Sequence, residues 1–174
     1  MNIEFKQKTM ELIDGLKSIS ANYGLGNDGN EFKIITQVFL YKFLNDKFSF
    51  EVKQLDPALQ GSGSWEERLA KYSDNDYGML LYRLGGDTAK LKPHHFISTL
   101  FSRQNESDFA KLFDDTLIDV AVQNSDIFSV VTDGGAKINL FDRLTDFISD
   151  SAKRDDFARA IINKLVNLSF EEIF

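Results

Sequence analysis

The sequence predicts an all-α protein, an irregular multi-helix bundle around one buried helix at about residues 31–50. Apolar residues recur every three to four positions over most of the chain, which is the period of an α-helix. Within residues 31–50 they form two lines on opposite sides of the helix, whereas a surface helix shows only one. The first line comprises Phe32, Phe39, Phe43 and Phe50, and the second comprises Ile34, Val38, Tyr41 and Phe48. We therefore expect packing partners on both sides.

Burial of the first line is expected to stabilise this helix far more than its charges do. Fully burying one Phe side chain is worth about 1.5–3 kcal/mol, so the whole line rivals the net stability of a typical domain. Lys42 and Asp46 stand at i, i+4, and a surface pair of that kind contributes at most about 0.5 kcal/mol. We therefore expect packing to place the helix and this ion pair to lie at its edge.

The other elements are predicted in order from capping signals and apolar spacing. Residues 3–20 form an amphipathic helix, and a glycine-rich loop follows over 22–30. A turn-rich connector spans 54–64, and the S-x-x-E pattern of Ser64–Glu67 starts the next helix. A short helix is expected over 77–84. Later helices are expected to begin at Lys92-Pro93, after Asn105 or Ser107, at Leu140 and at about Lys153.

The stretch near 127–140 has two interpretations. Asp133-Gly134-Gly135 is a turn signal between two short apolar runs, which predicts one small β-hairpin. An irregular loop is the alternative, because an isolated two-stranded ribbon is only marginally stable in water. Asn139 with Asp142 resembles a cap for a helix over 140–149.

The chain is expected to form a single helical domain over residues 1–168, because its length suffices for one sizeable core. Ser169–Glu172 repeats the S-x-x-E pattern, and Ile173 and Phe174 are apolar residues from which a helix would continue. One turn of free helix is not stable in water. We therefore interpret 169–174 as the start of a helix that leads into a further domain, and expect its apolar residues to be frayed.

Composition narrows the classes of protein. The chain has no Cys, which excludes disulfides, thiolate metal sites and cysteine nucleophiles. No apolar run approaches about 18 residues and the first residues include acids, so neither a membrane span nor a signal peptide is predicted, and a cytoplasmic location is expected. The formal charge of −7 argues against a surface that binds nucleic acid throughout, and leaves room only for a local basic patch.

No catalytic or metal-binding pattern is recognisable. His94 and His95 are adjacent, so in a helix their side chains diverge by about 100° and do not chelate one metal as an i, i+4 pair would. The chain has no P-loop, dinucleotide fingerprint, H-E-x-x-H or G-x-S-x-G motif. We therefore predict no catalytic residues, no cofactor-binding residues and no metal ligands.

One stretch departs from the acidic background. Residues 88–104 contain Lys90, Lys92 and Arg103 together with both histidines, and they contain no acid. A basic loop that leads into a helix is a plausible contact for DNA phosphates. The alternative interpretation is an ordinary solvated loop and helix face.

Residues 10–48 resemble a known family. The resemblance lies in three runs, Glu11–Lys17 (ELIDGLK), Glu31-Phe32-Lys33 and Val38–Phe48 (VFLYKFLNDKF). They resemble the N-terminal helical domain of type I restriction-modification DNA methyltransferase (M) subunits, where an E-Y-K run precedes a helix of the form L-x-F-L-K-Y-L-S-D-K-F. Phe32 stands for the family's usual Tyr, a Trp common near the first helix is missing, and residues 54–135 match only in helical character. Leu168–Phe174 looks like the junction before the methyltransferase domain.

The resemblance implies a module of a DNA adenine-N6 methyltransferase that is not itself the catalyst. The family's S-adenosylmethionine loop and N-P-P-[FY] motif lie downstream, and neither occurs here, so this chain should need no cofactor and be inactive alone. The implied partners are the specificity (S) subunit, a second M subunit and double-stranded DNA, with no membrane. A free-standing helical adaptor that binds a partner protein is the alternative, and a small enzyme whose site is assembled only in three dimensions is a third.

Overall fold

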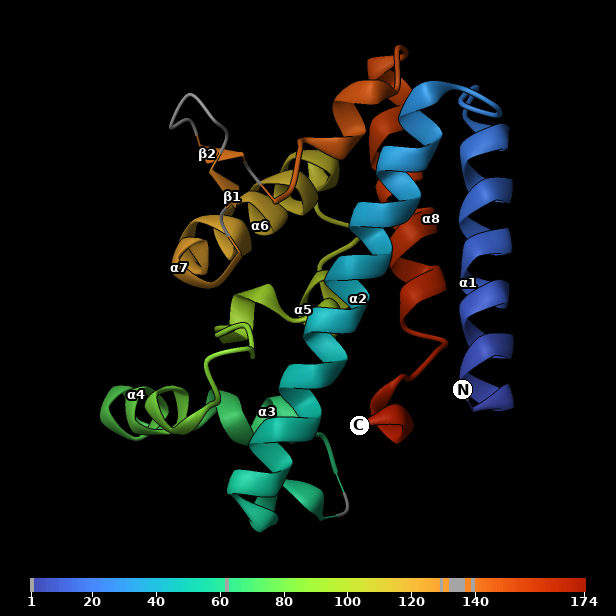
Figure 1. Cartoon of the computed structure of the whole chain (residues 1–174). Helices are drawn as coiled ribbons and strands as arrows, with labels where there is room; N and C mark the ends of the chain where they lie inside the picture. The colour runs from blue at the N-terminus through green and yellow to red at the C-terminus, as the bar shows by residue number, and fades with distance from the viewer. Residues whose placement is uncertain (1, 62, 129, 132–136, 139) are drawn as a thin grey trace.

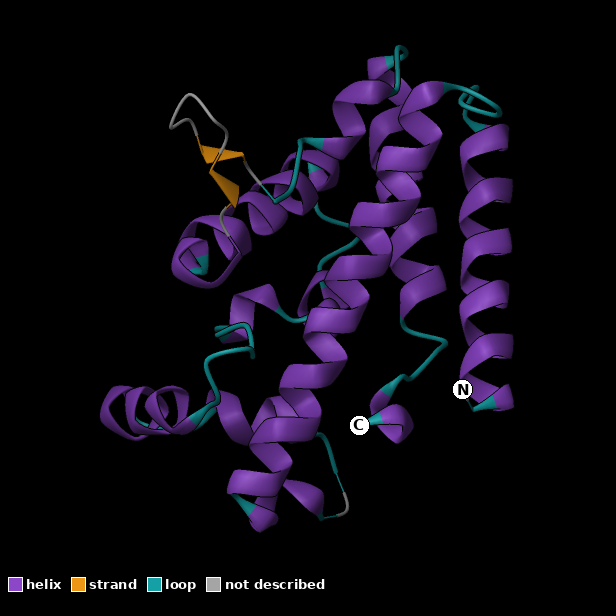
Figure 2. Cartoon of the chain, in the orientation of Figure 1, coloured by secondary structure: helices purple, strands orange, loops and turns teal. Residues whose placement is uncertain are grey.

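The computed structural model describes residues 2–61, 63–128, 130–131, 137–138 and 140–174. It confirms the all-α fold class, since helices make up nearly all of the ordered elements (Figure 2). The α-helices are α1 (Ile3–Asn22), α2 (Gly29–Leu55), α3 (Trp65–Ala70), α4 (Asp74–Arg83), α5 (Ile97–Ser102), α6 (Phe109–Gln123), α7 (Ser125–Phe128) and α8 (Arg154–Leu165). Single 3-10 turns are η1 (Pro57–Gln60), η2 (Pro93–His95), η3 (Leu144–Phe147), η4 (Ser151–Lys153) and η5 (Glu171–Ile173).

Helix α2 is the axis of the bundle, as expected. Its 27 residues span about 40 Å, and Asp28 caps its first turn by accepting a hydrogen bond from Asn30 N–H. Helices α1 and α8 lie along one side of α2, with α6 packed against α8 (Figure 1). The far end of α2 extends beyond them and carries α3 and α4, which leaves α4 projecting from the body of the molecule (Figure 1).

The expected burial of the first apolar line on α2 is wrong. The line of Ile34, Val38, Tyr41 and Phe48 is the fully buried one. On the other line Phe32 is 76% exposed and the remaining three rings are only half-buried. The reason is tertiary, because the C-terminal segment packs on part of this side of α2 only. Phe170 packs on Phe39, and Phe174 packs on Phe43 and Phe50, whereas Phe32 has no such cover.

The Lys42–Asp46 pair also lies elsewhere than expected. It is buried inside the bundle, with 4% and 5% of the two residues exposed and Lys42 Nζ 3.0 Å from Asp46 Oδ2. The same carboxylate accepts the backbone N–H of Phe170 and the side-chain amide of Asn45. The contact with Phe170 joins residues 124 positions apart, so sequence spacing alone described the pair as a surface one.

The C-terminal segment is packed where fraying was expected. Phe170 is fully buried, with its ring centroid 5.7 Å from that of Phe5 and 5.5 Å from that of Phe39. Glu171 forms an ion pair of 2.8 Å with Lys53 of α2. The S-x-x-E pattern starts only the single 3-10 turn η5, in which Ser169 Oγ accepts a hydrogen bond from the Glu171 N–H.

The described residues near 127–140 include one short pair of antiparallel strands, as the hairpin interpretation predicts. Strands β1 (Val130–Val131) and β2 (Lys137–Ile138) pair antiparallel, with Val130 opposite Ile138. The predicted turn Asp133–Gly135 and the predicted cap Asn139 lie outside the described residues. The α-helix expected over 140–149 is absent there in the described part, which has the 3-10 turn η3 instead.

Helix α4 and the segment that follows it position the candidate site. Buried Leu80 and Leu84 fix α4 to the body, and the hydroxyl of Tyr77 donates a 2.5 Å hydrogen bond to the Leu91 carbonyl.

None of the helices in the described residues is both long and apolar enough to cross a membrane.

Candidate nucleic-acid interface

Lys90 and Lys92 lie on a fixed loop between α4 and η2. Buried Ala89 and Leu91 alternate with the two exposed lysines, which is the pattern of an extended segment. Asn124, the C-cap of α6, clamps the loop: its side chain accepts from the Lys90 N–H at 2.7 Å and donates to the Lys90 carbonyl at 3.0 Å. The two ammonium groups therefore leave the same face of a held backbone, on residues roughly 7 Å apart.

Arg103 is separate from these lysines in its chemistry. It caps the C-terminal end of α5, and its guanidinium binds Glu106 in a two-point fork, with Nε–Oε2 at 2.7 Å and Nη2–Oε1 at 2.9 Å. The hydrogen bonds that Arg103 donates to Glu106 raise the pKa of Arg103 above its usual range. Arg103 is thus neutralised within the chain. The acid that neutralises it stands two positions beyond the acid-free stretch, so its i, i+3 spacing was a signal available in the sequence.

His94 and His95 converge, against the expectation from sequence. The Nε2 atoms of both rings approach one oxygen of Asp119 on α6, at 3.0 Å and 2.5 Å, and the ring centroids are 4.0 Å apart. The argument for divergence assumed a continuing α-helix, whereas the two residues form a single 3-10 turn that packs on α6. Both side chains therefore turn toward the same carboxylate.

The hydrogen bonds of His95 define its protonation. The Lys92 N–H points at His95 Nδ1 at 3.0 Å, so Nδ1 is an acceptor and the ring proton sits on Nε2, which donates to Asp119. His95 is fully buried, and this burial lowers its pKa below the ordinary value, which keeps the ring neutral.

Asp119 is ionised in this arrangement. Partial burial raises its pKa, but hydrogen bonds from His95, His94 and Gln123 outweigh that effect and lower the pKa to about 2. Two imidazoles therefore cover the negative charge that lies next to the lysine-bearing loop. Because the ring of His95 is neutral, Asp119 keeps its negative charge, which opposes a phosphate that approaches Lys90 and Lys92.

His94, His95 and Asp119 also lie close enough together to be compared with a metal site. One ligand atom each from His94, His95 and Asp119 lies within 4.8 Å of the others. A metal on His95 Nε2 would move the ring proton to Nδ1, where it would face the Lys92 N–H, so two donors would oppose each other. Histidines that bind metals normally donate their other N–H to an acceptor. The donor set of His95 therefore does not fit a metal ion.

Comparison with known proteins found no family model, no curated protein and no solved structure that matches the chain. The geometry of the site defines what it can bind. It presents two exposed ammonium groups on a rigid backbone, and ammonium groups bind phosphate oxygens as point charges without reading bases.

Proposed function

We propose that this chain is the N-terminal, non-catalytic assembly and DNA-clamping domain of a type I restriction-modification DNA adenine-N6 methyltransferase (M) subunit. Two features support the proposal: the resemblance carried by residues 10–48 and 168–174, and the all-α fold. The structural observation that carries the DNA contact is the loop of Lys90 and Lys92, which make no ion pair within the described part of the chain. The protein is proposed to work in the cytoplasm.

In this proposal the two lysines contact DNA phosphates and Arg103 contributes little, since Glu106 holds its guanidinium. Target sequence would be read by the specificity subunit, and methyl transfer from S-adenosylmethionine would take place in a following domain with its own motifs. The charge of −7 opposes DNA binding by the isolated chain, so the contact would require the assembled enzyme of M and S subunits.

The test is salt-dependent DNA binding by the assembled enzyme. Each lost phosphate contact flattens the plot of log K against log salt by about 0.9, so Lys90→Gln with Lys92→Gln should flatten it by about 1.8. The loss should be equal for all DNA sequences. Arg103→Gln should leave the slope nearly unchanged.

A matched control removes the same charge elsewhere. Lys17 and Lys71 are exposed and make no ion pair within the described residues, so Lys17→Gln with Lys71→Gln is expected to leave the slope unchanged. An unchanged slope in the Lys90 and Lys92 variant would remove the DNA contact from the proposal. A downstream reading frame without an N-P-P-[FY] motif would remove the methyltransferase assignment. It would favour the alternative of a free-standing adaptor that binds a partner protein. The observation that favours this alternative is that Tyr82 is 83% exposed.

A further inference from the structure

The C-terminal segment, residues 169–174, is fixed to a buried carboxylate of α2. The backbone N–H of Phe170 donates to Asp46 Oδ2 at 2.9 Å. The ring of the same residue packs on Phe5 of α1 and on Phe39 of α2. Apart from the single turn η5, residues 169–174 form no helix or strand. The position of the segment therefore depends on side-chain contacts that can open without unfolding of the bundle.

The carboxylate of Asp46 is linked to a second element through the neighbouring Asn45. The side-chain amide of Asn45 donates to Asp46 Oδ1 at 3.0 Å, and its Oδ1 accepts the backbone N–H of Ile97 at 3.0 Å. Ile97 is the first residue of α5. These three residues are at most 7% exposed, so little water competes for their hydrogen bonds. One buried chain of hydrogen bonds therefore joins Phe170 to the start of α5.

Helix α5 depends on this contact because of its own sequence. Its N-cap residue is Phe96, whose side chain has no hydrogen-bond acceptor, so Asn45 supplies an acceptor from another helix. The helix has only six residues, which makes it sensitive to the loss of one capping interaction. Turn η2 lies one residue before it, and there His95 accepts the N–H of Lys92. Loosening of α5 thus reaches the turn that holds the lysine-bearing loop.

We propose that Asn45 and Asp46 form a buried relay that couples docking of the C-terminal segment to the start of α5. With the segment docked, the Phe170 N–H holds the Asp46 carboxylate, which orients the Asn45 amide. The amide oxygen then faces Ile97. When the segment lifts off α2, Asp46 loses this donor and keeps Lys42, so the orientation of the Asn45 amide is no longer fixed. The relay is a property of this chain and does not require the proposed DNA contact.

Amide hydrogen exchange of the isotope-labelled full chain tests the relay. The readout is exchange at Ile97 and Leu100 of α5, relative to Phe113 of α6. Phe170→Ala undocks the segment and should speed exchange of the α5 amides about tenfold relative to α6, the upper range for loss of one hydrogen bond. Glu171→Gln removes an ion pair with α2 and should act on the same amides by about two- to fivefold. This milder variant decides the test if Phe170→Ala does not fold.

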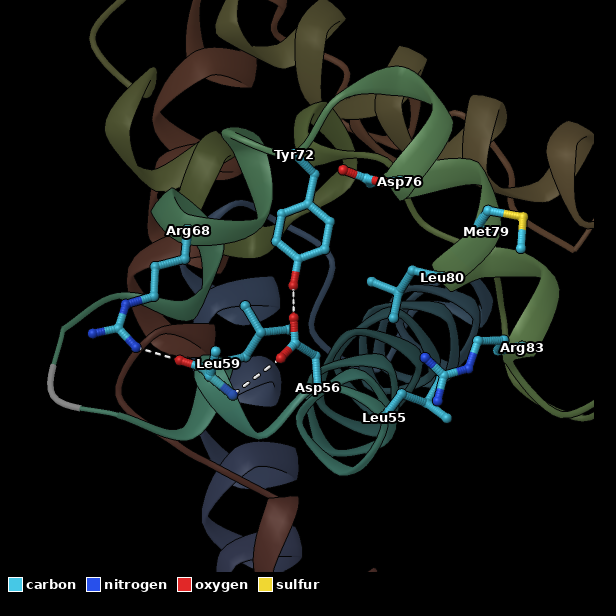
Figure 3. Close-up of a pocket in the computed structure, with 10 residues that line it drawn as sticks. Leu55, Asp56, Leu59, Arg68, Tyr72, Asp76, Met79, Leu80 and Arg83 are labelled. Atoms are coloured by element: carbon cyan, nitrogen blue, oxygen red, sulfur yellow. Dashed lines mark hydrogen bonds between the residues drawn. The ribbon is translucent and has the colours of Figure 1, made fainter.

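A control at the far end of α2 separates the relay from general loosening of that helix. Tyr72→Phe keeps its ring and removes the hydrogen bond to Asp56 at that end (Figure 3), so it should leave the α5 amides unchanged relative to α6. Equal changes at α5 and α6 in the two variants of the C-terminal segment would overturn the proposal.

An Asn45→Ala background interrupts the relay, so there the two variants of the C-terminal segment should have no further effect on α5. An effect that survives in this background would mean that the packing of α5 on α8 transmits it, and would overturn the proposal. The side-chain amide of Asn45 gives a second readout with the relay intact, because it should exchange faster together with α5. Faster exchange at α5 without a change at this amide would contradict the relay.

Discussion

The C-terminal segment and the loop before η2 are both held by an aspartate of a neighbouring helix, but the charge is balanced differently. Asp46 of α2 accepts the Phe170 N–H and is paired with the ammonium group of Lys42 inside the bundle. Asp119 of α6 accepts from the neutral ring of His95, which in turn accepts the Lys92 N–H. The first junction depends on a complete ion pair in a dry site, and the second depends on where a histidine keeps its proton.

The two junctions should therefore lose different amounts of folding stability when a charged partner is removed. A buried charge that loses its partner is very costly, because no water can replace the partner. A half-exposed carboxylate that loses an imidazole is still solvated, so the cost is smaller and depends on pH. The following variants test this contrast, from the largest expected effect to the smallest.

Asp46→Asn should be the most destabilising of these variants. It leaves the buried ammonium group of Lys42 uncompensated while keeping an acceptor for the Phe170 N–H, and the expected cost is about 3–5 kcal/mol of unfolding free energy in urea denaturation. The double variant Lys42→Met with Asp46→Asn removes both charges and should recover most of this loss. A single-variant cost below about 1 kcal/mol would mean that the pair is solvated.

Phe170→Ala should cost about 3–5 kcal/mol, because the ring is fully buried between Phe5 and Phe39. Phe39→Ala should cost about 2 kcal/mol, since its ring is only half-buried. Phe32→Ala is the matched control on the same line of α2 and should change stability by less than about 0.5 kcal/mol. Equal costs for all three would contradict the packing of the C-terminal segment on α2.

Asp119→Asn should cost about 1 kcal/mol near pH 7, after allowance for its exposure to solvent. Folding lowers the pKa of this carboxyl from 3.8 to about 2, so the unfolded chain binds the proton more readily. Its stabilisation is therefore full above about pH 5 and is lost as pH falls toward 2.

The difference between wild type and Asp119→Asn should accordingly shrink on acidification. His95 acts in the same direction, because burial lowers its pKa below 6.5 and its contribution declines as pH falls below that value. Asp114 acts in the opposite direction, because burial raises its pKa to about 6. Comparing the variant with wild type at each pH cancels the Asp114 contribution. A difference that grows at low pH would contradict the assignment of Asp119 as an ionised acceptor.

Local signals sufficed for the helices and failed for tertiary partners. Apolar spacing predicted the central helix, and the helix start at Ser64 that its S-x-x-E pattern predicted is confirmed. The burial of Phe170 could not be predicted, because its contacts with Asp46 and Phe39 join residues more than a hundred positions apart in the chain. The line of Phe32 looked like core because helical periodicity shows that a face is apolar but not how far a partner extends along it.

The candidate site divides in the same way. Lys90 and Lys92 are exposed on one loop, as the basic stretch without acids suggested. The ion pair of Arg103 could be foreseen only from Glu106, which lies two residues beyond that stretch. The convergence of His94 and His95 on Asp119 was missed because the carboxylate comes from another helix.

The protonation of His95 tests the contrast between the two junctions most directly. Nitrogen NMR of the isotope-labelled chain reports which ring nitrogen carries the proton. We predict that the ring is neutral at pH 7 and that its proton lies on Nε2, hydrogen-bonded to Asp119. We also predict strong protection of the Lys92 amide from hydrogen exchange, because this N–H donates to Nδ1. A doubly protonated ring at pH 7, or a proton on Nδ1, would contradict the hydrogen bonds that hold the lysine-bearing loop on α6.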